Sequence, residues 1–502
     1  CVDAREQSFG DAFREYRRRD FSALCAVGRT DLNLVELFLK QVDARPDAAA
    51  IITPQGRVVS YCELARASAA RAQIYQRAGV GAGDIVLIAR GVSVELYETL
   101  LAVFRLGAVA MFPEPAAGLK GLRLAVQAAQ PKAVATTGIG HVLRLLFPEL
   151  RRLRSLGEPG GEMVDREILA HLPGDAPALI TFTSGSTGRP KGIVRTSDFL
   201  VLQHTLLENL RRTKPGDVDL ISLPVFILSN LAAGAASVIP AGRLTRPAKL
   251  DGALLRKQIA DHRVNRIIAP PAVCARIAEG AAPMTQLEAV FTGGGPVFPN
   301  LLHAIARAAP NAAVHAVYGS TEAEPIAHLA MSEISEADWA AMANGAGLLT
   351  GKPVREISVD LRDHEIYVAG AHVNRGYLDP GDDKSTKSLR NGTLWHRTGD
   401  AARLDDQGRL WLLGRREAAS GDLFPFAVET AALSWPGVRQ AALLAQGERG
   451  TLAVSGDELD EADLKARAAR LGSIDVVILR EVPMDKRHNS KADYARLKKM
   501  LT

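Results

Sequence analysis

The chain has 502 residues, of which 47% are hydrophobic and 23% are charged, and its net charge is +5 at pH 7. This length predicts roughly two to four domains around a large buried core. The composition is that of an ordinary globular protein and excludes bulk disorder, collagen and coiled coil. The cysteines Cys1, Cys25, Cys62 and Cys274 lack the spacing of a zinc knuckle or a disulfide framework, so we expect a reducing, cytoplasmic location.

Three features of the chain bear on membranes and nucleic acids. Residues 1–30 carry charges throughout and contain no apolar core, so no signal peptide is expected. Residues 220–242 are uncharged, but Pro224 and Pro240 interrupt them, and they are typical of strand, turn, helix and strand rather than a transmembrane segment. Basic residues concentrate in 480–499 without any nucleic-acid-binding pattern, which predicts a solvated helix face and no nucleic-acid partner.

Short runs rich in Val and Ile alternate with amphipathic stretches along the chain, which predicts a mixed α/β and α+β fold with layered sheets and helices. A helix is expected at 94–109, with a glycine stop at Gly107, and 121–154 is expected to be helical because it is rich in Leu and Arg. Buried strands that run into turns are expected at 84–89, 178–182, 265–271 and 287–296, and a hairpin at 404–414.

A domain boundary is expected near Gly414 and Arg415, directly after the hairpin. Residues 415–502 have strand and helix signals of their own. The sequence therefore predicts a large N-terminal body, residues 1–414, and a small, mobile C-terminal α+β lid, residues 415–502.

The strand at 178–182 runs into a stretch with the chemistry of a polyphosphate-binding loop. It reads Thr183-Ser184-Gly185-Ser186-Thr187-Gly188-Arg189-Pro190-Lys191-Gly192. Glycines let backbone N–H groups converge on an anion, hydroxyls add short donors, and a lysine supplies positive charge. The stretch is not a Walker A loop, and a second candidate at 346–353 lacks both the first glycine and the final Ser or Thr. A flexible linker is disfavoured by the preceding strand.

This loop resembles the phosphate loop of the adenylate-forming superfamily, which comprises acyl-CoA synthetases, luciferases and adenylation domains of peptide synthetases. The other motifs of that superfamily follow in order, so that the resemblance covers essentially the whole chain. They are Gly293-Gly294-Gly295-Pro296, Tyr318-Gly319-Ser320-Thr321-Glu322, Thr398-Gly399-Asp400, Gly414-Arg415 and Lys491.

The resemblance implies an ATP site built from these motifs. The loop residues, the glycine turn 293–296 and Tyr318-Gly319-Ser320 would bind ATP, with Tyr318 stacked on adenine. Asp400 would accept hydrogen bonds from the ribose hydroxyls, and Arg415 would add donors at the hinge. The implied cofactors are therefore ATP and Mg²⁺.

The resemblance also implies three catalytic residues. Thr321 would hydrogen-bond the α-phosphate, and Glu322 would supply a hard oxygen ligand to Mg²⁺. Lys491, in the stretch from Pro483 to Lys491, would enter the site with the lid. It would bridge the attacking carboxylate and the α-phosphate while pyrophosphate leaves.

Stretches outside these motifs are similar to the olefin β-lactone synthetases, which adenylate a 3-hydroxy acid and use its own hydroxyl to displace AMP. They include 118–123, 224–240, 245–249, 318–325, 395–400, 405–411 and 487–491. No external thiol is needed, because the nucleophile is tethered to the electrophile.

Some residues depart from the pattern of the superfamily. Ser197 stands where relatives usually have His, Glu417 occupies a hinge position that is commonly Asp or Lys, and 416–426 is compressed and lacks the usual Lys-x-x-Gly loop. In acyl-CoA ligases that loop helps to line the pantetheine channel, so its shortening fits an enzyme that does not use CoA. It fits a carrier-protein partner equally well.

The substrate is expected to be a small carboxylic acid, either a 3-hydroxy acid or a simple acyl acid. The acyl pocket is expected between 226–234 and 292–296, with walls that include Phe226, Leu228 and Leu231, although the same spacing is typical of plain core. Acyl transfer to CoA or a carrier protein is the alternative to lactone formation. A more distant alternative is that the chain is a non-catalytic, nucleotide-binding relative. This alternative is disfavoured because Lys191, Glu322 and Lys491 are all present.

Overall fold

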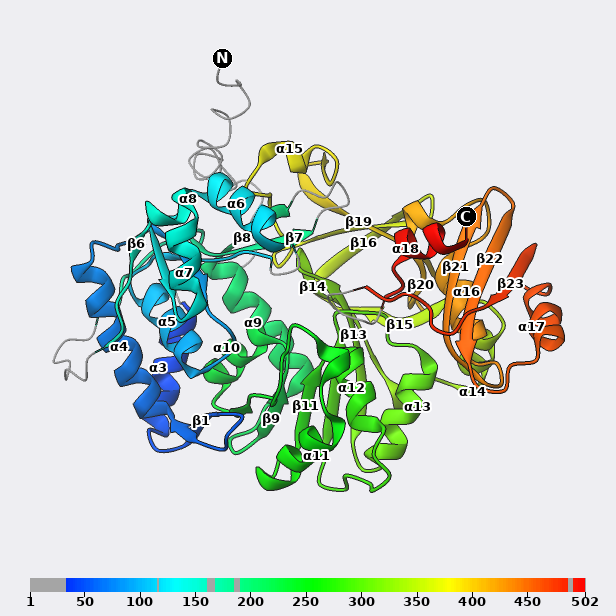
Figure 1. Cartoon of the computed structure of the whole chain (residues 1–502), viewed down its shortest axis with the longest axis horizontal. Helices are drawn as coiled ribbons and strands as arrows, with labels where there is room; N and C mark the ends of the chain where they lie inside the picture. The colour runs from blue at the N-terminus through cyan, green and yellow to red at the C-terminus, as the bar shows by residue number, and fades with distance from the viewer. Residues whose placement is uncertain (1–32, 115–116, 160–167, 185–189, 486–490, 502) are drawn as a thin grey trace, which may run out of the picture. The chain divides into compact units, whose positions relative to one another are not determined.

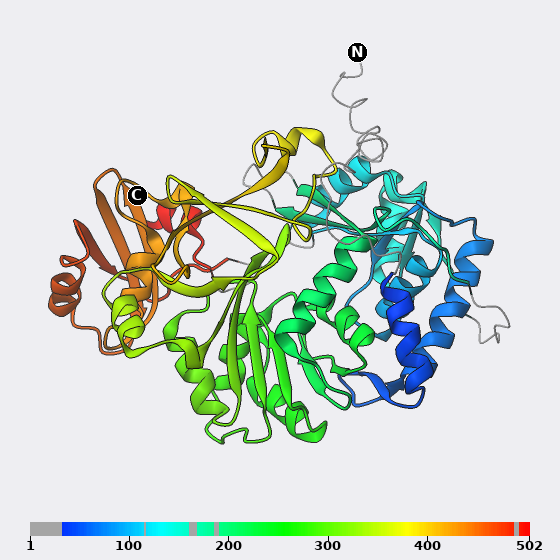
Figure 2. The same ribbon diagram turned by 180° about the vertical axis from the view of Figure 1, so that it is seen from behind.

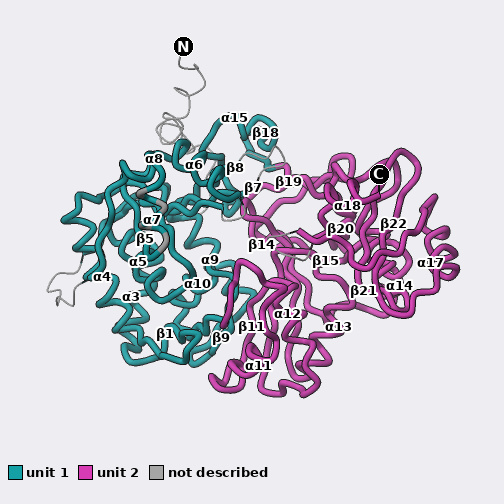
Figure 3. The backbone as a smooth tube through the Cα atoms, in the orientation of Figure 1, with its two compact units in different colours: residues 1–240, 371–396 teal, residues 241–370, 397–502 magenta. Residues whose placement is uncertain are grey.

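The computed structural model describes residues 33–114, 117–159, 168–184, 190–485 and 491–501 (Figure 1). The chain divides into two compact units, which Figure 3 colours separately. Unit 1 comprises residues 1–240 and 371–396, and unit 2 comprises residues 241–370 and 397–502. Both units combine sheets with helices, so the predicted α/β class is confirmed.

Unit 1 contains a largely parallel sheet with strand order β6-β5-β3-β4-β7-β8. Its strands are β3 Ile85–Ala89, β4 Val109–Phe112, β5 Ala133–Thr136, β6 Arg154–Ser155, β7 Pro177–Ser184 and β8 Pro190–Thr196. The last pair, β7 and β8, is antiparallel. The core under this sheet includes Leu87, Met111 and Ile180, which are at most 1% exposed, as expected for a sheet covered by helices.

The helices of unit 1 begin at residues suited to capping. Ser60 and Glu63 form a capping box at the start of α4, and Thr196 caps α9 by accepting a hydrogen bond from the Phe199 N–H. The helices are α3 Leu34–Ala44, α4 Tyr61–Arg77, α5 Val94–Arg105, α6 Gly118–Ala129, α7 Ile139–Leu146, α8 Pro148–Arg151, α9 Ser197–Arg211, α10 Pro224–Ala233 and α15 Pro380–Asp383.

Further strands complete unit 1. They are β1 Ala49–Ile52, β2 Val58–Ser60, β9 Val218–Ile221, β10 Ala236–Val238 and β18 Lys387–Arg390. Strands β9, β10 and β1 run parallel, and β2 is antiparallel to β1. Helix α3 packs beside α10, as seen from behind in Figure 2, and Arg45 donates to the Gly234 carbonyl.

Unit 2 contains strands in the order β16-β17-β19-β20-β15-β14-β13-β12-β11. They are β11 Arg266–Ala269, β12 Ala289–Gly293, β13 Ala313–Ser320, β14 Ala323–Ala330, β15 Leu348–Pro353, β16 Ile357–Arg362, β17 Glu365–Gly370, β19 Thr393–Leu404 and β20 Leu410–Arg415. The start of β19, up to His396, belongs to unit 1. Strands β11, β12 and β13 are parallel. The pairs β13–β14, β14–β15, β15–β20, β19–β20 and β16–β17 are antiparallel. The helical segments beside them are η3 Pro247–Lys249, α11 Gly252–Asp261, α12 Pro271–Ala278, α13 Pro299–Ala308, η4 Met331–Glu333 and α14 Glu336–Ala343.

The C-terminal part of unit 2 is a small α+β domain with its own core. The sheet contains β21 Val438–Gln446, β22 Arg449–Gly456 and β23 Ile474–Ile478, and the helical segments are η5 Arg416–Ala418, α16 Pro425–Ala432, α17 Glu461–Ala468 and α18 Tyr494–Leu501 (Figure 1). Val428, Leu443 and Leu452 form part of the buried cluster. The boundary at Gly414 and Arg415 coincides with the end of β20 and stays a prediction.

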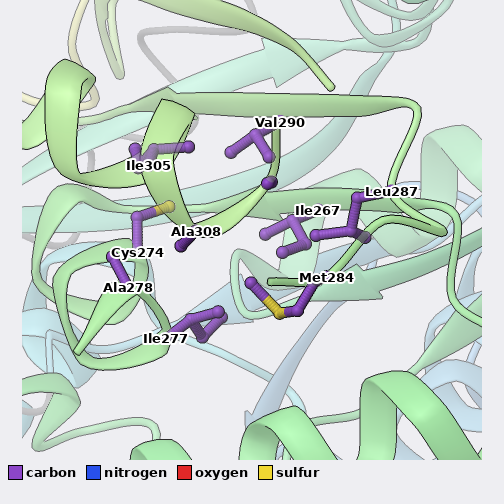
Figure 4. A pocket seen from close by; sticks show the side chains of 10 residues that line it. Ile267, Cys274, Ile277, Ala278, Met284, Leu287, Val290, Ile305 and Ala308 are labelled. Atoms are coloured by element: carbon purple, nitrogen blue, oxygen red, sulfur yellow. The ribbon is translucent and has the colours of Figure 1, made fainter. Parts of the chain in front are cut away.

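The core of unit 2 encloses a small apolar pocket between α12, α13 and strands β11 and β12 (Figure 4). Ile267, Ile277, Met284 and Val290 contribute to its lining, together with the thiol of Cys274. Burial raises the pKa of that thiol to about 12, so it stays protonated at neutral pH. The lining carries no charged group to orient a substrate, and the pocket is a packing feature of the core.

Most expected elements are present, and one expectation is wrong in part. Strands β3, β7, β11 and β12, helix α5 and the β19–β20 hairpin form where they were predicted, and 220–242 forms strand, helix and strand. The stretch 121–154 is not helical throughout, because β5 lies inside it and pairs in parallel with β3. Among the described residues, no helix has the length and hydropathy needed to cross a membrane.

Candidate active site

The expected phosphate loop connects the antiparallel strands β7 and β8 in unit 1. Thr183 lies directly opposite Lys191, and Ser184 lies opposite Pro190, so the two flanks of the loop are held in register. The expected residues Gly185, Ser186, Thr187 and Gly188 lie outside the described residues. Among the described residues of the loop, therefore, the structure places Thr183 and Lys191 side by side at its base.

Position 192 on β8 needs a residue without a side chain, because the segment that contains Tyr377 and Leu378 packs closely against it. A Cβ on Gly192 would lie only 2.9 Å from the Leu378 Cβ, and the Gly192 carbonyl accepts a hydrogen bond from the Leu378 N–H at 2.7 Å. Tyr377 forms an isolated β-bridge with Ile193. This close approach brings the Tyr377 ring to 5.4 Å from the Lys191 ammonium.

Tyr377 is one of three residues beside Lys191 that sequence reasoning missed. The Lys387 ammonium lies 5.8 Å from the same ring, and His396 pairs with Lys387 across strands β18 and β19. We call Lys191, Tyr377, Lys387 and His396 the two-lysine cluster. Nothing in the sequence spacing relates residue 191 to residue 377, because only the tertiary β-bridge brings them together.

The glycine turn and the tyrosine motif of unit 2 begin at the carboxyl ends of neighbouring parallel strands. Gly293 ends β12 and is paired with Val317 on β13, one residue before Tyr318. A Cβ on Gly293 would lie 2.5 Å from the Val317 carbonyl oxygen, so only glycine fits there. The turn 293–296 thus starts beside Tyr318, at the sheet edge where α/β proteins commonly bind ligands.

Tyr318 and Asp400 are in direct contact. The Tyr318 hydroxyl donates to an Asp400 carboxylate oxygen at 2.8 Å, and the Arg415 guanidinium lies 3.2 Å from the other Asp400 oxygen. Thr398 links Asp400 to Arg415, because its hydroxyl accepts from the Asp400 N–H and its carbonyl accepts from Arg415. We call Tyr318, Thr398, Asp400 and Arg415 the Tyr–Asp–Arg cluster.

Contacts within the Tyr–Asp–Arg cluster shift the pKa values of Tyr318 and Arg415. Burial and then the Asp400 charge raise the pKa of Tyr318 well above its ordinary value, so the phenol stays neutral. The pKa of Arg415 is raised mainly by Asp400, with smaller contributions from Tyr318, Glu322 and Glu417. Glu322 therefore lies within electrostatic range of Arg415.

Thr321 and Glu322 form the two-residue turn between β13 and β14. Ser320 and Ala323 are paired on either side of it, which fixes both turn residues next to the motif tyrosine. Gly319 lies close to the Ala323 carbonyl, where a Cβ would be 2.9 Å away. The Ser320 hydroxyl oxygen is buried and has no hydrogen-bond partner among the described residues, so it is available to a ligand.

A magnesium ion bound here would be held mainly by phosphate oxygens. Among the described residues, no group of three or more His, Cys, Asp or Glu side chains could hold a metal by itself. Mg²⁺ in nucleotide enzymes typically takes one or two carboxylates and completes its shell with phosphate and water. Glu322, which supplies the carboxylate of the turn between β13 and β14, fits that donor set.

Lys491 lies in the C-terminal domain, where its backbone pairs with Asp485. A β-bridge joins Met484 to Ala492, the Asp485 N–H donates to the Lys491 carbonyl at 2.8 Å, and the Lys491 N–H donates to the Asp485 carboxylate at 3.1 Å. Residues 486–490 lie outside the described residues. Three residues after Lys491, the Tyr494 hydroxyl donates to the buried Glu429 at 2.7 Å, which ties α18 to α16.

The expected acyl-pocket residues Phe226, Leu228 and Leu231 are all buried on α10, at 7%, 6% and 1% exposure. Asn230 on the same helix is fully buried and donates to Asp219 at 2.8 Å. The assignment of these residues to an acyl pocket stays a prediction.

Comparisons with known proteins identify the family. The AMP-binding enzyme family matches residues 38–378, which is more than half of the chain. The chain is 31% identical to the olefin β-lactone synthetase of Stenotrophomonas maltophilia, over 89% of this chain and 94% of that protein. It is 30% identical to the olefin β-lactone synthetase of Xanthomonas campestris, over 81% and 83%.

The fold has close counterparts among solved structures. ATP-bound MatB from Rhodopseudomonas palustris superposes with a TM-score of 0.79, at 20% identity, covering 93% of this chain and 99% of MatB. At this identity the likeness concerns the fold. Together with the family match, these findings establish that the chain belongs to the AMP-binding enzyme family and is an adenylate-forming ligase.

Proposed function

We propose that this enzyme adenylates a 3-hydroxy carboxylic acid with ATP and then closes the acyl adenylate to a β-lactone. The substrate is a small carboxylic acid, and the identity to two olefin β-lactone synthetases over most of the chain is the observation that carries the lactone step. The compressed segment after Arg415 agrees with a reaction that needs no CoA, since η5 ends at Ala418 and α16 begins at Pro425.

In the first step, a carboxylate oxygen of the acid attacks the α-phosphorus of ATP. The bond between the α-phosphorus and the bridging oxygen breaks, and pyrophosphate leaves with that electron pair. The Tyr–Asp–Arg cluster would bind the nucleoside, with the Asp400 carboxylate accepting from the ribose hydroxyls. Thr183 and Lys191 would bind the phosphates, and Thr321 would donate to the α-phosphate.

Lys491 would supply the charge that this step needs. Negative charge develops on the α-phosphate oxygens as the carboxylate attacks, and an ammonium placed there stabilises that charge more in the transition state than in the ground state. Glu322 would hold Mg²⁺ together with phosphate oxygens, and the ion would offset phosphate charge.

In the second step, the 3-hydroxyl oxygen of the same substrate attacks the acyl carbon. The carbon–oxygen bond to AMP breaks, AMP leaves with the electron pair, and the hydroxyl proton is lost to solvent. The product is a four-membered lactone. The hydroxyl and the acyl carbon belong to one molecule, so no second substrate has to be bound and ordered.

The described cysteines Cys62 and Cys274 are free thiols, which agrees with the cytoplasmic location that we propose for this enzyme.

The test uses purified protein with ATP and Mg²⁺, a 3-hydroxy acid, and the matched acid that lacks the hydroxyl, each with and without CoA. We expect the 3-hydroxy acid to give AMP and a product lighter than the acid by one water, independently of CoA. The matched acid should release pyrophosphate and stop at bound acyl-AMP. Product formation that depends strictly on CoA would contradict lactone formation and identify an acyl-CoA ligase. Acyl-AMP that accumulates from both acids would identify a missing carrier protein as the acceptor.

A further inference from the structure

The two-lysine cluster places two cations on one aromatic ring in unit 1. The Lys191 and Lys387 ammonium groups lie 5.4 Å and 5.8 Å from the centroid of the Tyr377 ring. Attraction to the ring partly offsets the cost of removing an ammonium from water. Lys191 comes from the base of the expected phosphate loop, whereas Lys387 comes from β18, far along the chain.

The segment that carries Tyr377 is fixed against β8 by backbone contacts. Tyr377 bridges Ile193, the Leu378 N–H donates to Gly192, and the Asn374 side chain donates to the Val194 carbonyl at 2.9 Å. The Tyr377 N–H in turn donates to Asp383 at 2.8 Å. The ring is therefore held in a fixed position relative to the strand that bears Lys191.

Lys387 is also held in place. Its ammonium donates to the Asn374 carbonyl, and its backbone pairs with His396 on β19. The side chain is half-buried, whereas Lys384, three residues earlier, is exposed. A lysine fixed in this way loses little further freedom when it binds an anion.

The positive charges of the two-lysine cluster affect the pKa of His396. Its side chain is 3% exposed, and burial, together with the charges of Lys387 and Lys191, holds its pKa well below the ordinary value. The imidazole is therefore neutral at physiological pH. Lys191 and Lys387 both act on the same buried group, as expected if the two ammonium groups share one small region of unit 1.

We propose that Lys387 is a second binding residue for the terminal phosphates of ATP, acting together with Lys191 across the Tyr377 ring. The inference rests on the proposed function, in which Lys191 binds the phosphates. Two like charges at one ring repel each other, and a polyphosphate relieves that repulsion by binding to both. The β- and γ-phosphates leave as pyrophosphate, so the contact belongs to ATP and pyrophosphate and not to AMP.

The test measures the affinities of ATP, pyrophosphate and AMP separately by calorimetry, without any acid substrate. Lys387→Met removes the charge, and Lys387→Gln removes it while keeping a donor for the Asn374 carbonyl. We expect both variants to bind ATP and pyrophosphate about 10- to 100-fold more weakly, the effect typical of losing one charge-assisted contact. AMP affinity should stay within about twofold of wild type, and Lys384→Met should leave all three affinities unchanged.

The outcomes separate this inference from the proposed function. Unchanged ATP affinity in Lys387→Gln, or equal weakening of ATP and AMP, would overturn the role of Lys387. If Lys387→Met does not fold, the ATP and pyrophosphate affinities of Lys387→Gln test the role of Lys387 by themselves. The thermal unfolding of Lys387→Gln and its AMP affinity then show whether the fold is intact. Failure of the wild type to make acyl-AMP or lactone would refute the proposed function, but the affinities for ATP and pyrophosphate would still test Lys387.

Discussion

Asp400 holds the Tyr–Asp–Arg cluster together at the level of single residues. It accepts from Tyr318 through one oxygen, lies beside Arg415 through the other, and is itself only 22% exposed at the side chain. Arg415 supplies positive charge that is always present, because a guanidinium does not deprotonate in proteins. A ligand with vicinal hydroxyls would therefore meet a carboxylate that two neighbours hold in position.

Lys491 is the residue whose removal should separate binding from chemistry. Lys491→Ala should lower acid-dependent ATP–pyrophosphate exchange by about 100- to 1,000-fold, the effect of losing one group that stabilises developing charge. AMP affinity should be unchanged, because the groups proposed to bind the nucleoside lie on β13, β19 and β20. Lys499→Ala, an exposed lysine of α18, is the matched control. Exchange at the wild-type rate in Lys491→Ala would refute its assignment.

At the level of elements, a buried polar network joins α9, α10 and β9 in unit 1. The Arg211 guanidinium lies 2.9 Å from Asp219 and also donates to Asn230 and Ser229, and Asp219 and Asn230 are fully buried. The network fixes α10, the helix expected to line the acyl pocket, to strand β9. A buried ion pair of this kind matters most when one partner is removed.

Arg211→Met should lower the free energy of unfolding by about 3–5 kcal/mol, because the buried Asp219 carboxylate loses a cationic partner. Thermal or urea unfolding measures the change. The neighbouring exposed residue gives the control, since Arg212→Met removes the same charge from the surface and should change stability by less than about 0.5 kcal/mol. Equal stability of the two variants would show that the buried pair contributes nothing.

The C-terminal domain also contains a buried carboxyl group, that of Glu429, which links α16 to β21 and α18. Glu429 accepts hydrogen bonds from the Leu443 N–H at 2.9 Å and from the Tyr494 hydroxyl at 2.7 Å. Burial raises the pKa of Glu429 to about 7, above the ordinary value of 4.5. Its contribution to stability is thus fully present below about pH 4.5 and is lost as the pH rises through about 7.

Between pH 5 and pH 8 the wild type should lose about 2–3 kcal/mol of stability relative to Glu429→Gln, which keeps an acceptor oxygen and cannot ionise. Urea unfolding at both pH values, followed by a probe in the C-terminal domain, measures the difference. Glu461→Gln, which changes a carboxylate that is 61% exposed, should follow the wild type at both pH values. Parallel pH dependences for the wild type and Glu429→Gln would contradict a raised pKa.

Across the whole molecule, sequence patterns predicted helices and strands well where a segment is long enough to show its apolar spacing and ends at a glycine. The strand at 287–296 and the helix at 94–109 have apolar spacing and glycine stops, and both form. The prediction for 121–154 failed at β5, because four residues, Ala133–Thr136, are too short to show a period of two. Pairing with β3 makes this segment a strand, and that pairing is a tertiary interaction.

The motifs by themselves determined the class of enzyme, because residue types fix which functional groups are available, and the family match confirms an adenylate-forming enzyme. They could not determine which groups meet. The contact of Tyr318 with Asp400 depends on the order of β13, β14, β15, β20 and β19 in the sheet, and that of Tyr377 with both lysines depends on a β-bridge to Ile193. Such contacts join residues distant in sequence through backbone hydrogen bonds, which carry no signature in side-chain type.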